Sequence, residues 1–271
     1  MNLFGLTGRV AVVTGGSGAL GSAMAKGLLD AGASVCIVGR DGDKAARVAA
    51  SLSADPARAM AVSADVVDAD AVQRAADAVL ARWGRVDVLV NAAGGNRPDA
   101  ITNADRSFFD LPLEAVRATI DLNMIGTLLP CQVFGRAMAE RQKGSIINIS
   151  SMSVPRALTR VVAYSAGKAA MENFTRWLAV YMAREVSPAV RVNAIAPGFF
   201  VADQNRALLI DQATGALTSR GQAIIAHTPM GRFGDPADLI GALLWLASDA
   251  ATFVTGIVVA VDGGFSAFSG V

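Results

Sequence analysis

The sequence predicts an α/β fold, a single domain over residues 1 to 271 in which a doubly wound parallel sheet of about seven strands carries helices on both faces. Short apolar runs alternate along the chain with longer segments of helical period, which is typical of a parallel sheet covered by helices. The chain is 53% hydrophobic over 271 residues, enough to bury one large core. No internal repeat, low-complexity tract or linker divides it.

The strands are predicted from the apolar runs, in this order: RVAVVT (9 to 14), ASVCIV (33 to 38), ARAMAVSA (57 to 64), VDVLVNA (86 to 92), GSIINIS (144 to 150), VRVNAIA (190 to 196) and GIVVAV (256 to 261). Segments of helical period between them predict helices at 19 to 31, 42 to 52, 68 to 83, 112 to 142, 163 to 185 and 235 to 247. Residues 199 to 230 are expected to form an irregular polar insertion, the substrate loop. Right-handed crossovers would wind these elements into one sheet.

Composition argues against several classes of function. Charged residues make up 17% of the chain and the net charge is +1, so nothing favours nucleic acid or an anionic membrane surface as a partner. No apolar run is long enough to span a bilayer and the N-terminus lacks a secretory pattern, which predicts a cytoplasmic protein. Cys36 and Cys131 are isolated in apolar runs, as buried reduced thiols are. The chain has a single histidine, His227, around which alone a histidine-based metal site would have to be assembled, and we do not expect one. His227 could hydrogen-bond the substrate or cap its loop, and we favour the structural role.

The segment VVTGGSGALG, residues 12 to 21, lies between the first predicted strand and the first predicted helix. Glycines there allow close backbone approach, and a helix N-terminus offers free N–H groups to a pyrophosphate. A tight turn also needs glycine for steric reasons alone, so the signal depends on its place in a βαβ unit. In that place it indicates a Rossmann fold that binds a dinucleotide through Gly15, Ser17, Gly18, Ala19 and Leu20.

In such folds, residues at the end of the second strand bind the adenine ribose and distinguish its 2′ substituent. A carboxylate there favours the 2′-hydroxyl of NAD, and an arginine accommodates the 2′-phosphate of NADP. Arg40 occupies the key place and Asp41 follows it. Arg40 therefore favours NADP(H), although a solvated loop charge or an NAD(H) site using Asp41 are the alternatives.

Tyr164 and Lys168 stand four residues apart, and Ser151 precedes the tyrosine by thirteen residues. On a helix that spacing places phenol and ammonium on one face, where the cation is expected to lower the phenol pKa from its usual ~10. A serine hydroxyl nearby could hold a carbonyl or alcohol oxygen. These residue types suit reversible carbonyl/alcohol chemistry, although a tyrosine and a lysine also share a helix face by chance.

With further motifs in the same order, the sequence resembles the short-chain dehydrogenase/reductase family from about residue 5 to the C-terminus. The motifs are TGGSGALG at 14 to 21, Asp65-Val66, NAAG at 91 to 94, Asn123 in DLN, Ser151, YSAGK at 164 to 168, Pro197-Gly198 and VDGG at 261 to 264. The resemblance implies that Tyr164 is the acid/base and that Lys168 lowers its pKa and binds the nicotinamide ribose. It also implies that Ser151 polarises the substrate oxygen and that Asn123 supports a proton-relay water.

The resemblance implies further cofactor contacts: Asp65 and Val66 beside the adenine, Asn91, Ala93 and Gly94 on the ribose side, and the main chain of Pro197, Gly198 and Phe200 at the carboxamide. Two positions depart from the family pattern. Ala19 occupies a slot that is usually glycine, where we expect its methyl group to be tolerated. Ala202 replaces the threonine that usually helps to hold the carboxamide, so that contact must come from backbone, water or a neighbour such as Gln204.

The loops expected to face the nicotinamide are polar. Amides suit hydroxyl recognition and guanidinium groups suit a carboxylate, so a small polyhydroxylated acid fits better than a steroid or an acyl chain. Each arginine there is equally well explained as a solubilising surface charge. The residues proposed to contact substrate are Asn96, Arg97, Ser151, Ser153, Arg160, Gln204, Asn205 and Arg206.

The segments GGNRP, ISSMS, NAIAPGFFVADQNRALL, HTPMGRFGDP and VDGGFSAFSGV together resemble the D-mannonate oxidoreductase (fructuronate reductase) branch of the family. That resemblance implies reduction of the C5 ketone of D-fructuronate to D-mannonate, and members of the branch are described with NAD(H), against the NADP that Arg40 favours. The alternatives are a short-chain reductase of a 3-oxoacyl thioester, keto sugar or polyol, or a dinucleotide-binding sensor without catalysis.

The family resemblance also implies a homo-oligomer, most commonly a tetramer, in which the apolar helices at 112 to 142 and 163 to 185 could pair with copies of themselves. The expected partners are thus a small-molecule substrate and other copies of the chain. Trp83, Trp177 and Trp245 fall on predicted helices and are interpreted as packing residues.

Overall fold

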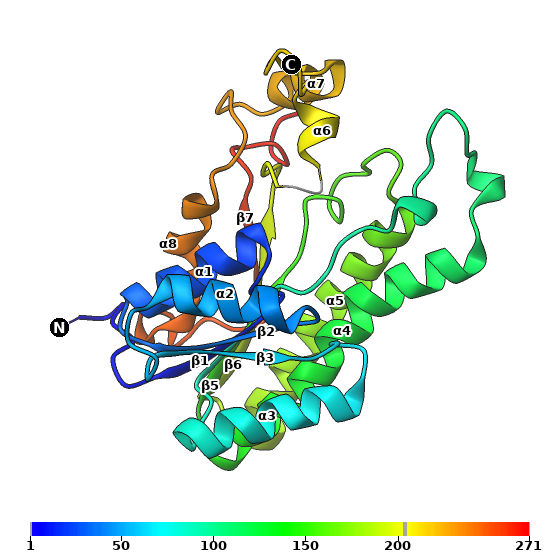
Figure 1. Ribbon diagram of the computed structural model, residues 1–271. Coiled ribbons are helices and arrows are strands. Elements are labelled where there is room, and N and C mark those ends of the chain that lie inside the picture. The colour runs from blue at the N-terminus through cyan, green and yellow to red at the C-terminus, as the bar shows by residue number, and fades with distance from the viewer. Residues whose placement is uncertain (1, 203–204, 271) are drawn as a thin grey trace.

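The computed structural model describes residues 2–202 and 205–270, and in them seven parallel strands form one sheet in the order β3-β2-β1-β4-β5-β6-β7 (Figure 1). The strands are β1 Val10–Thr14, β2 Ser34–Gly39, β3 Ala59–Ser63, β4 Val88–Asn91, β5 Gly144–Ile149, β6 Val190–Pro197 and β7 Val258–Val261. The order reverses between β1 and β4, which makes the sheet doubly wound and creates a crevice at its carboxyl edge. The predicted fold class is confirmed.

Helices cover both faces of the sheet. They are α1 Ala19–Asp30, α2 Gly42–Leu52, α3 Ala69–Trp83, α4 Leu113–Glu140, α5 Val162–Tyr181, α6 Arg206–Leu209, α7 Ser219–Ala226 and α8 Ile240–Ala247. One buried apolar cluster joins α1, α2 and α8 to the sheet, and a second joins α3, α4 and α5 to its other side (Figure 1). The alternation read from the sequence therefore corresponds to two cores, one on each face.

The insertion at 199 to 230 was predicted to be irregular, and this was wrong in part because it contains α6 and α7. Thr218 caps the start of α7, its hydroxyl accepting a hydrogen bond of 3.1 Å from the N–H of Gly221. Leu209 of α6 and Ile224 of α7 are buried. Both helices are too short for their period to stand out from the polar residues around them, and tertiary packing stabilises them instead.

The carboxyl ends of the central strands lie level with one another. Thr14 pairs with Asn91, Asn91 pairs with Asn148, and Asn148 pairs with Ala194 across four adjacent strands. The segments that follow these strands consequently emerge at one edge of the sheet. This register brings together motifs that are far apart in the sequence.

Candidate active site

The glycine turn after β1 packs tightly against the segment that follows β4. Gly15 has a φ of 63°, and a Cβ there would stand 2.7 Å from the Cα of Ala93. A Cβ on Gly21 would collide with the carbonyl oxygen of Gly15 and stand 2.9 Å from the Cα of Gly16. Gly18 precedes α1 without any side-chain cap. The turn thus leaves the first N–H groups of α1 to an external acceptor.

The surroundings of Ala19 leave room for its methyl group, as we expected. Its methyl group is exposed, so the departure from glycine costs no clash in the structure. The hydroxyl of Ser17 lies close to the end of β2, because a Cβ on Gly39 would come within 2.9 Å of it. Leu20 is half-buried beside the same core. The turn and the end of β2 therefore form one continuous edge.

At that edge Arg40 and Asp41 differ in how they are used. The carboxylate of Asp41 caps α2, accepting a hydrogen bond of 2.9 Å from the N–H of Lys44. Arg40 is exposed, and in the described part of the chain its side chain forms no hydrogen bond or ion pair, while its carbonyl accepts from Ser63 at 3.0 Å. The Arg40 guanidinium, unlike the Asp41 carboxylate, is therefore available to bind a ligand at this edge. On the next loop, Asp65 accepts from the N–H of Val67 at 3.2 Å and Val66 is buried.

Asn91 faces the interior. Its side-chain N–H₂ donates to Asn148 at 2.9 Å and to the sulfur of Cys131 at 3.2 Å, so it ties β4 to β5 and α4. The Asn91 side-chain N–H₂ is therefore already used, while its Oδ1 is buried and has no hydrogen-bond partner within the described residues. Burial raises the pKa of the Cys131 thiol, and that of Cys36, to about 12, which makes both thiols unreactive packing groups as predicted.

Asn123 and Lys168 converge on Gly94. A Cβ at Gly94 would stand 2.8 Å from Oδ1 of Asn123 and 3.0 Å from Nζ of Lys168. Asn123 is fully buried, accepts from the N–H of Gly95 at 3.1 Å and donates to its carbonyl at 2.8 Å. Only glycine leaves both groups in place, so the NAAG motif and the two side chains form one unit.

Lys168 is 4% exposed and donates a hydrogen bond of 2.7 Å to the carbonyl of Ile149 at the end of β5. Its Nζ lies 5.7 Å from the ring centroid of Tyr164. Burial lowers the pKa of the Lys168 ammonium to about 8. The lysine therefore stands below the tyrosine ring, oriented by the main chain of the sheet.

The phenol of Tyr164 departs from the expected titration. Burial raises its pKa, and a hydrogen bond with the hydroxyl of Ser151 opposes that rise. We expected Lys168 to lower the pKa of this phenol, and the structure does not support that expectation. The Lys168 ammonium faces the aromatic ring and the carbonyl of Ile149, while desolvation acts on the phenol itself. The phenol is consequently protonated at neutral pH.

The hydroxyl of Ser151 also accepts from the N–H of Ser153 at 3.1 Å. Ser153 is 4% exposed, and its own hydroxyl has no hydrogen-bond partner within the described residues. One buried acid was missed by the sequence reasoning. Glu172 accepts from Ser150 at 2.6 Å and lies four residues beyond Lys168, a spacing that could have revealed it.

The residues predicted to contact substrate fall into different roles. Arg97 is exposed and forms two hydrogen bonds, of 3.0 and 2.9 Å, with the carboxylate of Asp99, so its guanidinium fork is already paired. Asn205 uses its amide to fold its own loop, donating to Phe200 and accepting from Ala202. Each of these bonds uses one side of the amide, and a substrate contact of Asn205 stays a prediction. Asn96, Arg160 and Arg206 are exposed, and Gln204 lies outside the described residues.

The segment after β6 lies against the segment after β7. The N–H of Gly198 donates to Val261 at 2.9 Å, and a Cβ on Gly198 would stand 2.7 Å from the Cα of Asp262. The ring of Phe200 is buried in the core, so only its main chain is available to a carboxamide, as expected. A cavity of about 210 Å³ adjoins this segment, lined in part by Phe199, Thr228 and Asp262.

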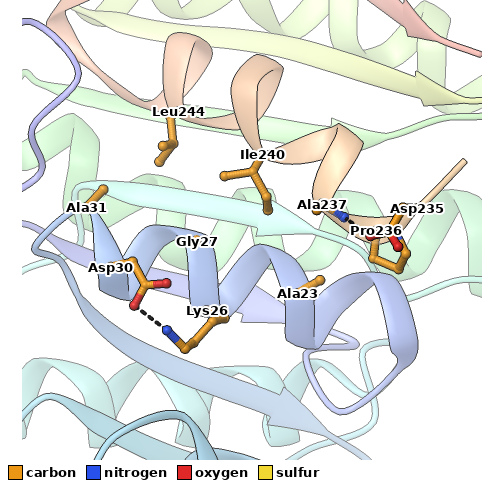
Figure 2. A pocket seen from close by; sticks show the side chains of 10 residues that line it. All are labelled: Ala23, Lys26, Gly27, Asp30, Ala31, Asp235, Pro236, Ala237, Ile240 and Leu244. Atoms are coloured by element: carbon orange, nitrogen blue, oxygen red, sulfur yellow. Dashed lines mark hydrogen bonds and ion pairs between the residues drawn. The ribbon is translucent and has the colours of Figure 1, made fainter.

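A larger cavity, about 550 Å³, lies on the outer surface between α1 and α8, where Ala23 and Gly27 face Ile240 and Leu244 (Figure 2). None of the predicted catalytic or cofactor residues lines it. Within residues 2–202 and 205–270 no group of three His, Cys, Asp or Glu is placed to hold a metal ion. None of the helices in those ranges combines the length and apolarity of a membrane span.

The chain is similar to known oxidoreductases over almost its whole length. A family model described as enoyl-(acyl carrier protein) reductase matches residues 15–266. An uncharacterized oxidoreductase, UxuB, of Bacillus subtilis (strain 168) is 48% identical over 275 residues, covering 98% of each chain.

Two solved structures extend the comparison. One from Haemophilus influenza, described as a candidate D-mannonate oxidoreductase with bound NAD, is 41% identical with a TM-score of 0.91 and covers 98% of each chain. The other, a gluconate 5-dehydrogenase from Burkholderia cenocepacia J2315 in complex with NADP and tartrate, is 33% identical with a TM-score of 0.86 and 98% coverage of each chain.

Proposed function

The chain belongs to the short-chain dehydrogenase/reductase family, and from that premise we propose that it interconverts a keto sugar acid and its alcohol, using Tyr164 as the acid/base. One observation carries the proposal. Ser151, Tyr164 and Lys168 meet beside Asn123 and Gly94 at the carboxyl edge of the sheet. Only in the folded chain do these groups form one site.

The cofactor is a nicotinamide dinucleotide, NAD or NADP, and the residues present fit it. Gly15 and Gly21 keep the turn free of side chains, and the N-terminus of α1 faces the place where the pyrophosphate would bind. Lys168 and the main chain beside Gly94 would hold the nicotinamide ribose. The bound nicotinamide supplies or accepts the hydride.

The chain's own groups handle the proton and the substrate oxygen. The Ser151 hydroxyl holds the carbonyl oxygen beside the phenol, and Tyr164 donates its proton to that oxygen as the ketone is reduced. Because burial raises the pKa of Tyr164, the phenol is in its acid form at neutral pH. Lys168 fixes the ribose, and Asn123 supports a water through which the phenol is reprotonated.

Tyr164→Phe tests this mechanism. The ring and its packing remain, while the proton donor is lost, so turnover should fall by at least about 10²-fold. Affinity for the cofactor, measured by fluorescence titration with NADH or NADPH, should change little. A Phe variant that keeps wild-type turnover would remove Tyr164 from the proposed chemistry.

For the substrate we propose D-fructuronate, reduced to D-mannonate. The support is the similarity to the Haemophilus structure, the sugar-acid substrate class of the Burkholderia enzyme, and the polar loops around the site. The test is a spectrophotometric assay of purified protein with NADH and with NADPH across D-fructuronate, other keto sugars and keto sugar acids. Rapid turnover of another ketone with none of fructuronate would refute the substrate assignment.

Reduction of a 3-oxoacyl thioester is the second candidate, because the matching family model takes its description from acyl-carrier-protein chemistry. The near-neutral net charge of +1 gives no overall attraction for an acidic carrier, and the amide-rich loop suits a sugar acid better than an acyl chain. Including acetoacetyl thioesters in the same assay separates the two. A sensor without catalysis needs the glycine turn but not the convergence of all four catalytic residues.

The same premise supports two further proposals. We expect NADP(H) to bind through Arg40, since Asp41 is already used to cap α2. We also propose a homo-oligomer, with tetramers as the expected form, assembled through the long helices α4 and α5. Both are tested below.

A further inference from the structure

Arg220 lies on α7, inside the insertion, and reaches the loop that joins the two central catalytic residues. Its Nη1 donates to the hydroxyl of Thr159 at 3.4 Å. Thr159 stands between Ser151 and Tyr164 in the sequence. Figure 1 shows α6 and α7 beyond the end of the sheet at which the strands finish. The insertion thus contacts, through an arginine, the loop that connects Ser151 to Tyr164.

The neighbour of Thr159, Arg160, has a φ of 76°. A residue other than glycine is strained in this left-handed conformation, and it adopts that conformation only where contacts with its surroundings hold it there. One such contact is visible, because the N–H of Thr102 donates to the carbonyl of Arg160 at 3.1 Å. Three segments therefore meet at Arg160: the loop after β4, the loop after β5 and α7.

Arg220 contacts the residue that precedes Arg160, so the two arginine side chains start from adjoining positions. The pKa of Arg220 is lowered by burial and by the charge of Arg160. No ion pair in the described part of the chain involves either arginine. Like charges repel at short range unless an anion joins them, and a carboxylate matches the planar fork of a guanidinium.

We propose that Arg160 and Arg220 together bind the carboxylate of the sugar-acid substrate, so that the bound acid joins α7 to the loop between Ser151 and Tyr164. The inference rests on the proposed function and identifies what selects an acid over a neutral sugar. Arg97 is unsuited to this role because Asp99 already occupies its fork. Arg220 is a specificity residue that no local sequence pattern indicates.

The test compares two ketones that differ only at one end, D-fructuronate and its neutral counterpart D-fructose. In Arg220→Met and Arg160→Met, kcat/KM for D-fructuronate should fall by about 10- to 100-fold, with most of the change in KM. The weak turnover of D-fructose should stay the same or rise. Arg220→Lys retains charge without the fork and should fall between wild type and Arg220→Met.

Arg74→Met, an exposed position on α3, is the matched control and should leave both ketones unaffected. Thermal unfolding and NADPH titration of each variant identify any loss due to misfolding. If the wild type reduces D-fructuronate and Arg220→Met does so equally well, or if both ketones lose activity in parallel, the carboxylate role is refuted while the proposed function stands. A wild type that reduces no sugar acid overturns the proposed function itself, before any variant is compared.

Discussion

Among single residues, Lys168 carries the clearest conflict between stability and function. A buried ammonium loses hydration, and the carbonyl of Ile149 at 2.7 Å replaces only part of it. Burial accordingly lowers its pKa to about 8, below the ordinary value of 10.5. In the proposed mechanism the charge beside Tyr164 and the ribose accounts for this cost. Residues retained for function at the expense of stability are expected in active sites.

This conflict predicts how stability changes with pH. Between pH 8 and 10.5 the unfolded chain holds a proton on Lys168 that the folded chain has released, so the free energy of unfolding rises with pH in that window. Relative to Lys168→Met, the wild type should gain up to about 3 kcal/mol across it. Urea unfolding at several pH values measures the difference, and Lys44→Met, at an exposed position on α2, should show none. A difference that shrinks or stays constant with rising pH would contradict the buried charge.

Arg40 gives a second prediction for a single residue. Removing the guanidinium in Arg40→Leu should weaken NADPH binding by about tenfold or more, as expected for the loss of a charge-assisted contact to phosphate, and should change NADH binding by less than about twofold. Fluorescence titration of both cofactors measures this. Arg47→Leu, exposed on the neighbouring α2, is the control. Equal losses for both cofactors would mean that Arg40 does not read the 2′-phosphate.

At the scale of elements, the connection from β1 to α1 depends on Gly21 having no side chain. In Gly21→Ala the new Cβ collides with the carbonyl of Gly15, so the turn must shift. We expect a loss of about 1–3 kcal/mol in the free energy of unfolding and at least tenfold weaker cofactor binding. Gly241→Ala is the matched control: a Cβ there meets nothing within 4 Å, and alanine should stabilise α8 by up to about 1 kcal/mol. Unfolding curves and NADH titration compare the two, and a Gly21→Ala variant that binds NADH normally would show that the turn can relax.

The strands and helices also show how much of the secondary structure was predictable from the sequence. Five of the seven strands lie within the apolar run that predicted them, and β2 and β6 each extend one residue past theirs, to Gly39 and Pro197. The agreement is close because burial on both faces requires such a run. The helix predicted at 235 to 247 begins instead with a 3₁₀ turn, Pro236–Leu239, capped by Asp235. The short helix α7 escaped prediction because its stability comes from packing against α6 rather than from its own period.

The residues of the candidate site likewise divide into those that were predictable from the sequence and those that were not. Tyr164, Lys168 and the glycine turn were predictable because their spacing is local, and Ser151 because it follows closely after an apolar run that predicts a strand. Arg220 was missed because its role depends on a contact with a distant segment, at Thr159. Glu172 was missed although its spacing from Lys168 is local, because its partner Ser150 lies on another element. The hydrogen bonds of Asn205 within its own loop were not predictable, because an amide in a polar loop looks the same in sequence whether it binds a ligand or its own backbone.

For the whole molecule, the exposed aromatic side chains of α5 are the feature that a single chain does not explain. Trp177, predicted to be a packing residue, is 59% exposed, and Tyr181 is 43% exposed. Trp177 stacks on Tyr181 with ring centroids 5.3 Å apart, and Phe174 extends the row at 6.5 Å. A row of ordered, exposed aromatic rings on a long helix is typical of a protein interface. The assembly proposed above would bury it.

Trp177→Glu should therefore dissociate the oligomer, since a carboxylate would have to enter a dry interface opposite its own copy. Light scattering coupled to size-exclusion chromatography measures the change in mass at micromolar protein. Phe253→Glu provides the comparison, because Phe253 is a fully exposed aromatic residue outside α5. Dissociation by Phe253→Glu alone would place the interface elsewhere, and a wild-type chain that elutes as a monomer would refute the assembly. Because α5 also carries Tyr164 and Lys168, a dissociated Trp177→Glu variant should lose turnover together with mass if assembly holds that helix in place.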